Sequence, residues 1–565
     1  MTAVLGINSF SHDTSAGLLV DGAVVAIGEQ ERFNRDTHTK AFPDDAVAFC
    51  LRQAGLSVHD LDAVAFAHDP RIDFLRGAAD ALRRAAPKRL AAQAYTDLRL
   101  VSRERRFRRR WDYRGRIVNV GHHDAHAASA FFSSPFDQAA VLTLDRGGDF
   151  LSTTMQVGQG HRLRLLQQVR NPHSLGELYS AFTWLLGFDA GADEGKVMGL
   201  SSYGRDTYVA QLRDLVRLLD DGRFTLDLTW FAYQRERGRF SRRGRERFGA
   251  RRAPESEITR HHEDLAYAVQ DLVEEAGVHI ARSLQQATGL RHLCLAGGVA
   301  LNSVMNARIL AESGFDEVFI QPAASDAGNA VGAAAWWWHQ QLGQPRAWQM
   351  EHAFWGPSWT DADTAAALTA RGLTFREVAD PAAEAARRIA DGKVVGWFQG
   401  RAEIGPRALG ARSILADPRR AEMKDVVNTQ VKRREGFRPF APSVLDERGH
   451  EYFDGYATNP YMLLVLPVRK DKHDVIPAVT HVDGTGRLQS VTRDFNPAYH
   501  RLITEFDRLT GVPVVLNTSF NLRGEPMVNT PGETVADYLR SGMDALVLGR
   551  YLVEKQPTAG PDQEG

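Results

Sequence analysis

Two segments far apart in the chain repeat the same order of a buried strand, a small polar loop and a hairpin. The first begins at Val4–Asn8 and runs through SHDTSAG into two apolar stretches separated by Asp21 and Gly22. An Asp-Gly pair between apolar runs is a strong indication of a two-residue hairpin. The second begins at Val141–Phe150 (VLTLDRGGDF) and continues through LSTTMQV, a GQG turn and RLRLLQQV. The repeat predicts a duplicated α/β scaffold, although short strand-turn-strand units also recur in unrelated α/β proteins.

The segment Gly400–Leu445 carries many cations on backbone that glycine and proline divide into turns. A guanidinium group can bind two oxygens of a phosphate or carboxylate at once. Backbone fixed by glycine and proline turns can hold several guanidinium groups close together. A solvated basic surface is the alternative, since that is the usual fate of a charge run. Two later segments, His481–Val491 and Val512–Pro526, again combine an arginine with small polar residues just after a strand-like run, where open α/β sheets bind ligands, and this favours an oxyanion site. The cations of the first segment are Arg401, Arg407, Arg412, Arg419, Lys432, Arg433, Arg434 and Arg438.

Length, charge and cysteine content narrow the class of protein. A chain of 565 residues exceeds one ordinary core and predicts two domains. The net charge of −1 gives no general attraction to nucleic acid or to a membrane. Cys50 and Cys294 are the only cysteines, which excludes a disulfide framework and cysteine-based zinc fingers and fits a reducing cytoplasm. The start MTAVLGINSF does not resemble a signal peptide, and the longest apolar stretch, Ala330–Trp338, is about half the length that spans a bilayer. We therefore expect a cytoplasmic protein with no nucleic-acid or membrane partner.

The segment GHHDAHAASAFF contains two histidines four residues apart. Its alanines favour helix, so His122 and His126 would lie on one face about one turn apart. This spacing suits two ligands of one metal ion, although such pairs also cap or pack helices. His123 and Asp124 lie off that face.

Two further segments are rich in arginine. Arg103–Arg116 (RERRFRRRWDYRGR) predicts an amphipathic helix with a solvated face, with binding of a nucleic acid strand as the alternative. Arg235–Arg252 is poor in aliphatic residues and predicts a mobile excursion, either disordered or a lid near an acceptor site.

Four segments carry a resemblance to a known family. GRAEIGPRALGARSILADPR, VKRREGFRPFAPSVL, HVDGTGRLQSV and VLNTSFNLRGEP resemble the C-terminal signature blocks of the O-carbamoyltransferases of antibiotic biosynthesis, the nodulation and tobramycin carbamoyltransferase family. The N-terminal half agrees as well. The resemblance implies an α/β fold with a duplicated actin-like ATPase (Kae1-like) domain at 1–350, an α/β YrdC-like domain at 381–555 and a tail at 556–565. Prolines and a polar, alanine-rich middle predict that residues 351–380 between them are a connector with the first helix of the second domain.

The resemblance also implies the activity. Carbamate is a poor electrophile, so the family joins it to a good leaving group: carbamoyl phosphate and ATP, with Mg²⁺, give carbamoyl-adenylate in the second domain. A hydroxyl of a small natural product then attacks in the first domain. Cations would neutralise phosphate charge, and polar side chains would bind the adenylate. The matching catalytic residues are Arg407, Lys432, Arg438 and Arg487, and those that would bind carbamoyl-adenylate are Asn517, Ser519, Asn521 and Arg523.

In the first domain the family places a metal, iron by preference, on the histidine pair together with two aspartates. Those aspartates correspond to Asp145 and Asp326 here. A set of two histidines and two aspartates offers nitrogen and oxygen ligands, which suits Fe²⁺ or another divalent transition ion. The positions that would contact the nucleotide are Lys196, Gly297, Gly298 and Asn302.

Transfer to an alcohol also requires the alcohol to lose a proton. His12, beside Asp13 in the loop SHDTSAG, is the predicted base because an imidazole titrates near neutral pH. The family has a histidine in this loop, whereas a surface or capping histidine is the alternative. His38 and Lys40 are second candidates.

Three functions therefore stand side by side. The first is O-carbamoyl transfer to a small molecule, the second carbamoyl or threonylcarbamoyl transfer to a tRNA or protein, and the third a non-catalytic actin-like nucleotide-binding protein. The neutral net charge disfavours transfer to a tRNA, which would need a basic surface. The absence of cysteine-based zinc fingers and the order of the two domains disfavour transfer to a protein. The third function would leave the arginine-rich half of the chain without a role. The sequence leaves open the acceptor, the exact metal and the oligomeric state, a homodimer included.

Overall fold

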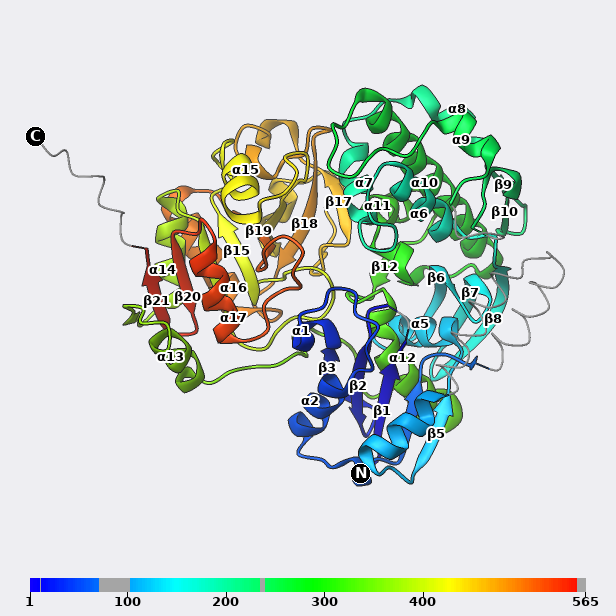
Figure 1. The fold of residues 1–565 in the computed structure, drawn as a ribbon, viewed down its shortest axis with the longest axis horizontal. Helices are drawn as coiled ribbons and strands as arrows, with labels where there is room; N and C mark the ends of the chain where they lie inside the picture. The colour runs from blue at the N-terminus through cyan, green and yellow to red at the C-terminus, as the bar shows by residue number, and fades with distance from the viewer. Residues whose placement is uncertain (11, 71–101, 234–238, 556–565) are drawn as a thin grey trace, which may run out of the picture. The chain divides into compact units, whose positions relative to one another are not determined.

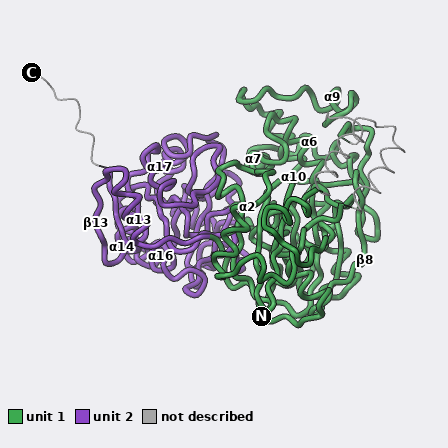
Figure 2. The backbone as a smooth tube through the Cα atoms, turned by 60° about the horizontal axis from the view of Figure 1, so that its bottom comes forward, with its two compact units in different colours: residues 1–356, 404–406, 463–465 green, residues 357–403, 407–462, 466–565 purple. Residues whose placement is uncertain are grey.

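The structure is a computed structural model that describes residues 1–10, 12–70, 102–233 and 239–555. The chain forms two compact units (Figure 2). The first contains residues 1–356, 404–406 and 463–465, and the second contains residues 357–403, 407–462 and 466–565. The predicted tail at 556–565 lies outside the described residues.

The first unit contains a five-stranded sheet with the order β3-β2-β1-β4-β5 among the described residues. β1, β2 and β3 pair antiparallel, whereas β4 is parallel to both β1 and β5. Asp21 (φ 48°) and Gly22 (φ 83°) form the predicted two-residue turn between β2 and β3. The strands are β1 Ala3–Asn8, β2 Ser15–Val20, β3 Ala23–Glu29, β4 Ala63–Phe66 and β5 Arg116–Asn119.

A second five-stranded sheet in the same unit repeats this topology. Its order is β12-β11-β6-β7-β8 within the described part of the chain. β6, β7 and β8 pair antiparallel, and β11 is parallel to both β6 and β12. Three antiparallel strands followed by two parallel ones thus occur twice, which confirms the predicted duplicated, actin-like scaffold. The strands are β6 Gln138–Gly148, β7 Leu151–Gln159, β8 Arg162–Arg170, β11 His292–Ala296 and β12 Glu317–Ile320.

Two helices link the repeats at close range. α5 (His122–Phe131) and α12 (Asn329–Trp336) pack against each other, and α12 also packs on β1 (Figure 1). A Cβ at Gly332 would lie 1.9 Å from Ala125 O, and one at Gly6 would lie 1.7 Å from Ala330 O. Glycine is therefore required where these elements touch.

The remaining helices surround the sheets, and no helix of the described residues is long and apolar enough to cross a membrane. They are α1 Gln30–Asn34, α2 Asp44–Ala54, α6 Leu175–Leu185, α7 Glu194–Ser201, α8 Val209–Arg213, α9 Arg242–Phe248, α10 Arg260–Thr288 and α11 Ser303–Glu312, with a small hairpin of β9 Val216–Leu218 and β10 Phe224–Leu226.

The two arginine-rich segments behave differently from each other. Residues 102–111 form the predicted helix, with Phe107 buried and Arg105 and Arg109 exposed. The predicted mobile excursion is wrong over residues 239–252. There α9 folds onto the unit because the Phe248 ring is buried 5.3 Å from the ring of Phe182. Residues 234–238 lie outside the described residues.

The second unit is built on a mixed sheet with the order β13-β21-β20-β14-β15-β19-β16-β18-β17. The segment 351–380, expected to be a connector with the first helix of the second domain, contributes α13 and β13 to this unit. The strands are β13 Arg376–Glu377, β14 Val395–Phe398, β15 Arg412–Ala416, β16 Ala441–Leu445, β17 Leu464–Pro467, β18 Thr485–Val491, β19 Val514–Ser519, β20 Ala545–Leu548 and β21 Tyr551–Glu554, and the helices are α13 Asp361–Thr369, α14 Pro381–Ala390, α15 Met423–Val426, α16 Pro497–Thr510 and α17 Pro531–Arg540.

Substitution Gly332→Ala should destabilise the protein. The new methyl group would overlap Ala125 O on α5, and overpacking of a core typically costs about 1–3 kcal/mol. Gly195→Ala is the control, because Gly195 also lies in a helix, α7, but a Cβ built there would meet no atom within 4 Å. An alanine there should raise stability by roughly 0.5–1 kcal/mol. Denaturant unfolding measures both, and equal stability of Gly332→Ala and wild type would contradict the close helix contact.

Candidate active sites

Four buried side chains meet in the first unit. His122 and His126 lie on α5, Asp145 on β6, and Asp326 in the turn before α12. The two histidine Nε2 atoms are 3.2 Å apart, and His122 Nε2 is 3.3 Å from Asp145 Oδ2. His126 Nε2 is 3.4 Å from Asp326 Oδ1. The four ligand atoms all lie within 4.8 Å of one another, so the fold brings together the four residues that the family resemblance assigned to a metal.

Backbone N–H groups and one more carboxylate hold this cluster in place. The N–H groups of Gly147 and Gly298 donate to Asp145 Oδ2 and Oδ1, each at 3.0 Å. Asp149 accepts the N–H of His122 at 2.5 Å, which satisfies one of the open donors in the first turn of α5. The sequence analysis missed Asp149, although its place in the same VLTLDRGGDF segment as Asp145 could have indicated it.

Negative charge exceeds positive charge in the cluster. Burial disfavours a charged His122, but Asp326 and Asp145 raise its pKa to about 10. Burial and the charge of His122 lower the pKa of His126. Burial would raise the pKa of Asp145, yet the hydrogen bond with His122 holds it well below its usual range. At neutral pH, two carboxylates therefore face one imidazolium, an arrangement that favours a cation.

The donor set fits a divalent transition ion. Imidazole and carboxylate ligands lie roughly 2.0–2.2 Å from such an ion, so the ligands of one ion are close neighbours. Asp326 Oδ1 is buried and has no hydrogen-bond partner among the described residues. A buried carboxylate oxygen in that state is costly unless a cation compensates it.

Asp13 bridges two imidazoles in the same unit. His12 Nδ1 is 3.2 Å from Asp13 Oδ2, and His38 Nδ1 is 2.7 Å from Asp13 Oδ1. Asn8 Nδ2 donates to the main-chain oxygen of Asp13 at 3.2 Å and holds the loop. Burial opposes charge on His12, but Asp326 and Asp13 raise its pKa to about 9. His12 thus interacts electrostatically with the metal cluster and is protonated at neutral pH when no metal is bound.

The two glycines predicted to contact a nucleotide shape the end of β11. Gly297 has a φ of 95°, and a Cβ there would lie 2.2 Å from Leu144 O, so the position requires glycine. The N–H of Gly298 already donates to Asp145. The sequence predicted that a helix opens directly at these glycines, and a short 3₁₀ helix at Gly298–Leu301 does so. The α-helix α11 follows at Ser303, with Asn302 as its N-cap.

Asn302 and Lys196 have partners within the protein. Asn302 Oδ1 accepts the N–H of Met305 at 3.1 Å, and its Nδ2 donates to Gln270 Oε1 at 2.9 Å. Lys196 Nζ is 3.1 Å from Asp193 Oδ2. The side chain of Asn302 therefore caps α11. Contact of Asn302 or Lys196 with a nucleotide stays a prediction.

Five cations gather in the second unit. Burial lowers the pKa of Arg487, and the charges of Arg407, Arg434 and Arg438 lower it further. Burial, Arg434 and Arg438 likewise hold the pKa of Lys432 well below its usual range. Burial and Arg438 lower the pKa of Arg407 to about 10. An anion bound among these groups would relieve their mutual repulsion. Arg434 was not among the predicted site residues, although it stands in the same KRR run as Lys432.

The predicted polar residues of β19 divide into two groups. Lys432 Nζ donates to the main-chain oxygens of Ser519 and Asn521, each at 2.8 Å, so these two residues lie beside the cations. Asn517 Nδ2 instead lies within 3.1 Å of three acceptors in the protein. Its amide nitrogen is therefore engaged within the protein, and binding of carbamoyl-adenylate by Asn517 stays a prediction.

Other arginines of Gly400–Leu445 have structural roles. Arg412 is fully buried, and its guanidinium donates to Gln399 O at 2.8 Å. Arg419 forms an ion pair with Asp417 at 2.7 Å. Neither side chain is directed to an exogenous anion, which separates them from the five clustered cations.

Three more of the predicted site residues are Arg487, Arg523 and Lys40. Arg487 lies within β18 rather than after a strand. Arg523 is exposed in the loop that follows β19, and Lys40 is exposed near His38 in sequence.

Glu403 fixes the loop that carries Arg407. Its Oε1 accepts the N–H groups of Leu409 at 2.7 Å and of Ala411 and Arg412 at 3.2 Å each. A buried carboxylate that accepts several N–H groups holds a loop firmly. The sequence analysis missed this residue because its partners are main-chain groups, which leave no pattern of side chains.

Fold and sites together define a two-unit α/β protein with an actin-like first unit and an arginine-rich second unit. Residues 3–335 match the family described as Carbamoyltransferase N-terminus, and residues 386–555 match that described as Carbamoyltransferase C-terminus. The chain therefore belongs to the carbamoyltransferase family, as the resemblance indicated.

Relatives match over nearly the whole chain. Nodulation protein NolNO of Sinorhizobium fredii is 41% identical over 575 residues, which cover 98% of this chain and 80% of that protein. The uncharacterized protein sll1178 of Synechocystis is 39% identical over 608 residues, covering 100% of this chain and 98% of that protein.

Among solved structures, component A of the (R)-2-hydroxyglutaryl-CoA dehydratase of Acidaminococcus fermentans matches with a TM-score of 0.33 and 12% identity, covering 61% of this chain and 100% of that one. HypF of T. kodakarensis matches with a TM-score of 0.33 and 14% identity, covering 60% of this chain and 48% of that one.

Substitution His126→Ala should lower the amount of bound transition metal, because it removes one of four converging ligands. His123→Ala is the matched control. His123 lies on the same helix and is equally buried, but its Nδ1 contacts Thr143 Oγ1 at 2.7 Å. Elemental analysis of purified protein gives the metal-to-protein ratio. The same ratio in His126→Ala and wild type would count against the metal site.

The stability of the metal-free protein should depend on pH through His12. Its pKa of about 9 lies above the unperturbed value of about 6.5. The stabilisation is therefore complete below pH 6.5 and is lost as the pH rises through 9. We expect the free energy of unfolding of the wild type, relative to His12→Asn, to fall across this range. Exposed His59→Asn is the control, and parallel curves for wild type and His12→Asn would contradict the raised pKa.

Proposed function

We propose that this carbamoyltransferase uses ATP to activate carbamoyl phosphate as carbamoyl-adenylate and then transfers the carbamoyl group to a hydroxyl of a small natural product. The observation that carries the proposal is the cluster of five cations in the second unit. Burial and mutual repulsion lower the pKa values of Arg407, Lys432, Arg434 and Arg487. An anion bound among these groups would offset their mutual repulsion, and phosphate groups supply such a charge.

Activation would begin with the hydrolysis of carbamoyl phosphate. Water cleaves carbamoyl phosphate to carbamate and phosphate. A carbamate oxygen then attacks the α-phosphorus of ATP, forming the carbamoyl-adenylate bond and releasing pyrophosphate. Negative charge is concentrated on phosphoryl oxygens throughout, so preorganised guanidinium groups stabilise both the transition state and the leaving group.

The transfer step places the acceptor hydroxyl in the first unit. The hydroxyl oxygen attacks the carbamoyl carbon, the bond to AMP breaks, and the hydroxyl proton passes to a base. His12 is suited to this role because its Nδ1 lies 3.2 Å from Asp13 Oδ2, which fixes the orientation of the imidazole ring. His38 holds the other oxygen of Asp13 at 2.7 Å, so it positions the pair.

The protonation state of His12 links it to the metal cluster. Attraction by Asp326 raises the pKa of His12 in the protein without metal. Ligation of Asp326 would remove that attraction and favour the neutral imidazole that a base needs. The residues that would hold the ion are His122, His126, Asp145 and Asp326, and a bound ion would supply Lewis-acid polarisation of a nucleotide or carbamoyl oxygen.

Substitution Arg487→Ala should reduce acceptor-independent pyrophosphate release from ATP and carbamoyl phosphate by about 10²–10³-fold, the usual effect of removing one preorganised donor. Arg433→Ala is the matched control, because Arg433 is exposed in the same basic run as Lys432 and Arg434. A coupled pyrophosphate assay measures both. Wild-type release by Arg487→Ala would remove this residue from the activating site.

Substitution His12→Ala should leave pyrophosphate release intact and slow carbamoyl transfer by roughly 10²–10⁴-fold, the usual contribution of general base catalysis. Carbamoyl-adenylate should then accumulate. Mass spectrometry with a panel of polyols, aminoglycosides and macrolides follows both species, with His59→Ala as control. Product yields equal to wild type in His12→Ala would exclude His12 as the base.

A further inference from the structure

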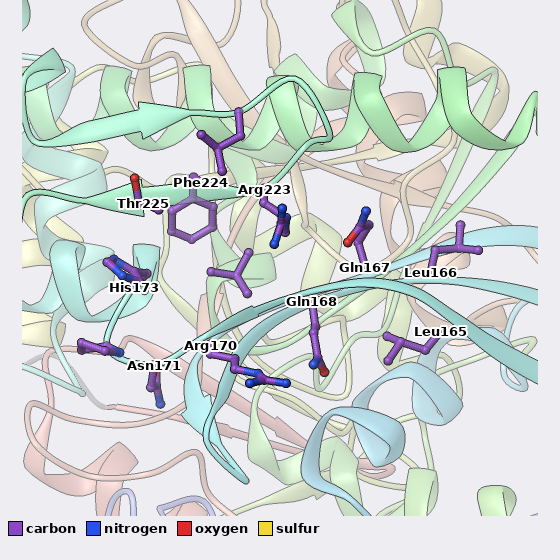
Figure 3. Close-up of a pocket in the computed structure, with 13 residues that line it drawn as sticks. Leu165, Leu166, Gln167, Gln168, Arg170, Asn171, His173, Arg223, Phe224 and Thr225 are labelled. Carbon is purple, nitrogen blue, oxygen red and sulfur yellow. The ribbon is translucent and has the colours of Figure 1, made fainter. Parts of the chain in front are cut away.

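A cavity of about 650 Å³ lies in the first unit beside the outer strand of the second sheet (Figure 3). Its size is within the range of roughly 300–1,000 Å³ that holds small-molecule ligands. One wall is β8 with the residues that follow it, and the other is the β9–β10 hairpin. The lining residues are 165–173, Leu219 and 223–225.

Both walls are fixed to the rest of the unit. The N–H of Leu226 on β10 donates to His173 Nδ1 at 3.0 Å, and His279 Nε2 is 2.8 Å from Leu219 O. On the opposite wall the register of β7 and β8 shifts between Met155 and Gln156, so β8 has a bulge at Leu166. Bulges on outer strands often stand next to sites, since they redirect side chains. The cavity is therefore a built feature of the fold.

The polar lining residues are three amides, two arginines, His173 and Thr225. Gln167, Gln168 and Asn171 provide both donors and acceptors, and Arg170 is exposed beside them. Asn171 Oδ1 is buried and has no hydrogen-bond partner among the described residues. Arg223 is balanced by Asp221, with Nε at 2.7 Å from Oδ2. None of the residues that line the cavity is an aspartate or glutamate.

Asn171 joins this cavity to the metal cluster. A Cβ at Gly147 would lie 2.2 Å from Asn171 Nδ2, so the two residues are in contact. Gly147 in turn donates its N–H to Asp145. Ser174, next to His173, donates to Arg146 O at 2.9 Å. The inner end of the cavity is thus built on the loop that carries a predicted metal ligand.

We infer that this cavity binds the acceptor of the transfer reaction, and that the acceptor is a neutral or anionic molecule rich in hydroxyl or amide groups rather than a polycation. The inference rests on the proposed function. Amides hydrogen-bond to hydroxyl groups in either sense, and Phe224 and Val169 supply apolar surface for C–H faces. A polycation would meet Arg170 with no carboxylate in the lining to offset its charge, since Arg223 is already paired with Asp221.

A cysteine-labelling experiment on the full chain tests the cavity directly. Both natural cysteines are buried, so maleimide would react with an introduced cysteine. Leu165→Cys places a bulky label at an exposed lining position, and Arg164→Cys places it at the neighbouring exposed position outside the lining. Saturation-transfer NMR then follows binding of three probes: cellobiose, which is neutral, lactobionate, which is anionic, and kanamycin, which is polycationic.

We expect cellobiose and lactobionate to bind the wild type and the labelled Arg164→Cys protein. Labelling of Leu165→Cys should weaken both at least tenfold, and Gln168→Ala and Arg170→Ala should weaken them without labelling. Failure of both probes to bind the wild type, unchanged binding after labelling of Leu165→Cys, or equally strong binding of kanamycin would overturn the inference.

Pyrophosphate release without acceptor separates this inference from the proposed function. The labelled Leu165→Cys protein should release pyrophosphate at the wild-type rate, because activation is assigned to the other unit. Absence of release in the wild type would contradict the proposed function, while the binding of the probes would still decide whether the cavity is a site.

Discussion

The first unit depends on the close contact of α5 with α12. α5 carries two of the four converging ligands, and the turn before α12 carries Asp326. Gly332 lets the two helices touch at Ala125 O. Side chains more than 200 positions apart in sequence therefore come within hydrogen-bond range. Asn329 Nδ2, for example, lies 3.1 Å from His126 Nε2. The duplicated sheets provide two rigid supports, and the helices between them determine where the cluster forms.

Charge is handled in opposite ways in the two units. In the first, carboxylates exceed the imidazolium, which favours a cation. In the second, the charges of Arg407, Arg434 and Arg438 lower the pKa of Arg487, which favours an anion. Where an arginine has a structural role, the protein neutralises it internally, as Asp417 does for Arg419. Like charges held close together repel one another, so we expect a ligand of opposite charge where the cations of the second unit gather.

Local sequence patterns predicted much of this arrangement. The Asp21-Gly22 turn and the pairing of His122 with His126 follow from backbone conformation and helical period, which act within a few residues. The contacts that position the site escaped prediction because they join distant segments. Asp13 meets His38 across 25 positions of chain, and Glu403 holds its loop through main-chain groups. α9 was mistaken for a mobile excursion because the contact that anchors it is made by Phe182, far away in sequence.

In the proposed function, the second unit activates a carbamoyl group before any acceptor takes part. This order can be tested by incubating the full chain with carbamoyl phosphate, ATP, Mg²⁺ and Fe²⁺ in the absence of acceptor and analysing the mixture by mass spectrometry. We expect carbamoyl-adenylate, together with pyrophosphate and phosphate. Conversion of ATP to ADP and phosphate, with no adenylate, would contradict this expectation and would favour an actin-like nucleotide-hydrolysing role instead.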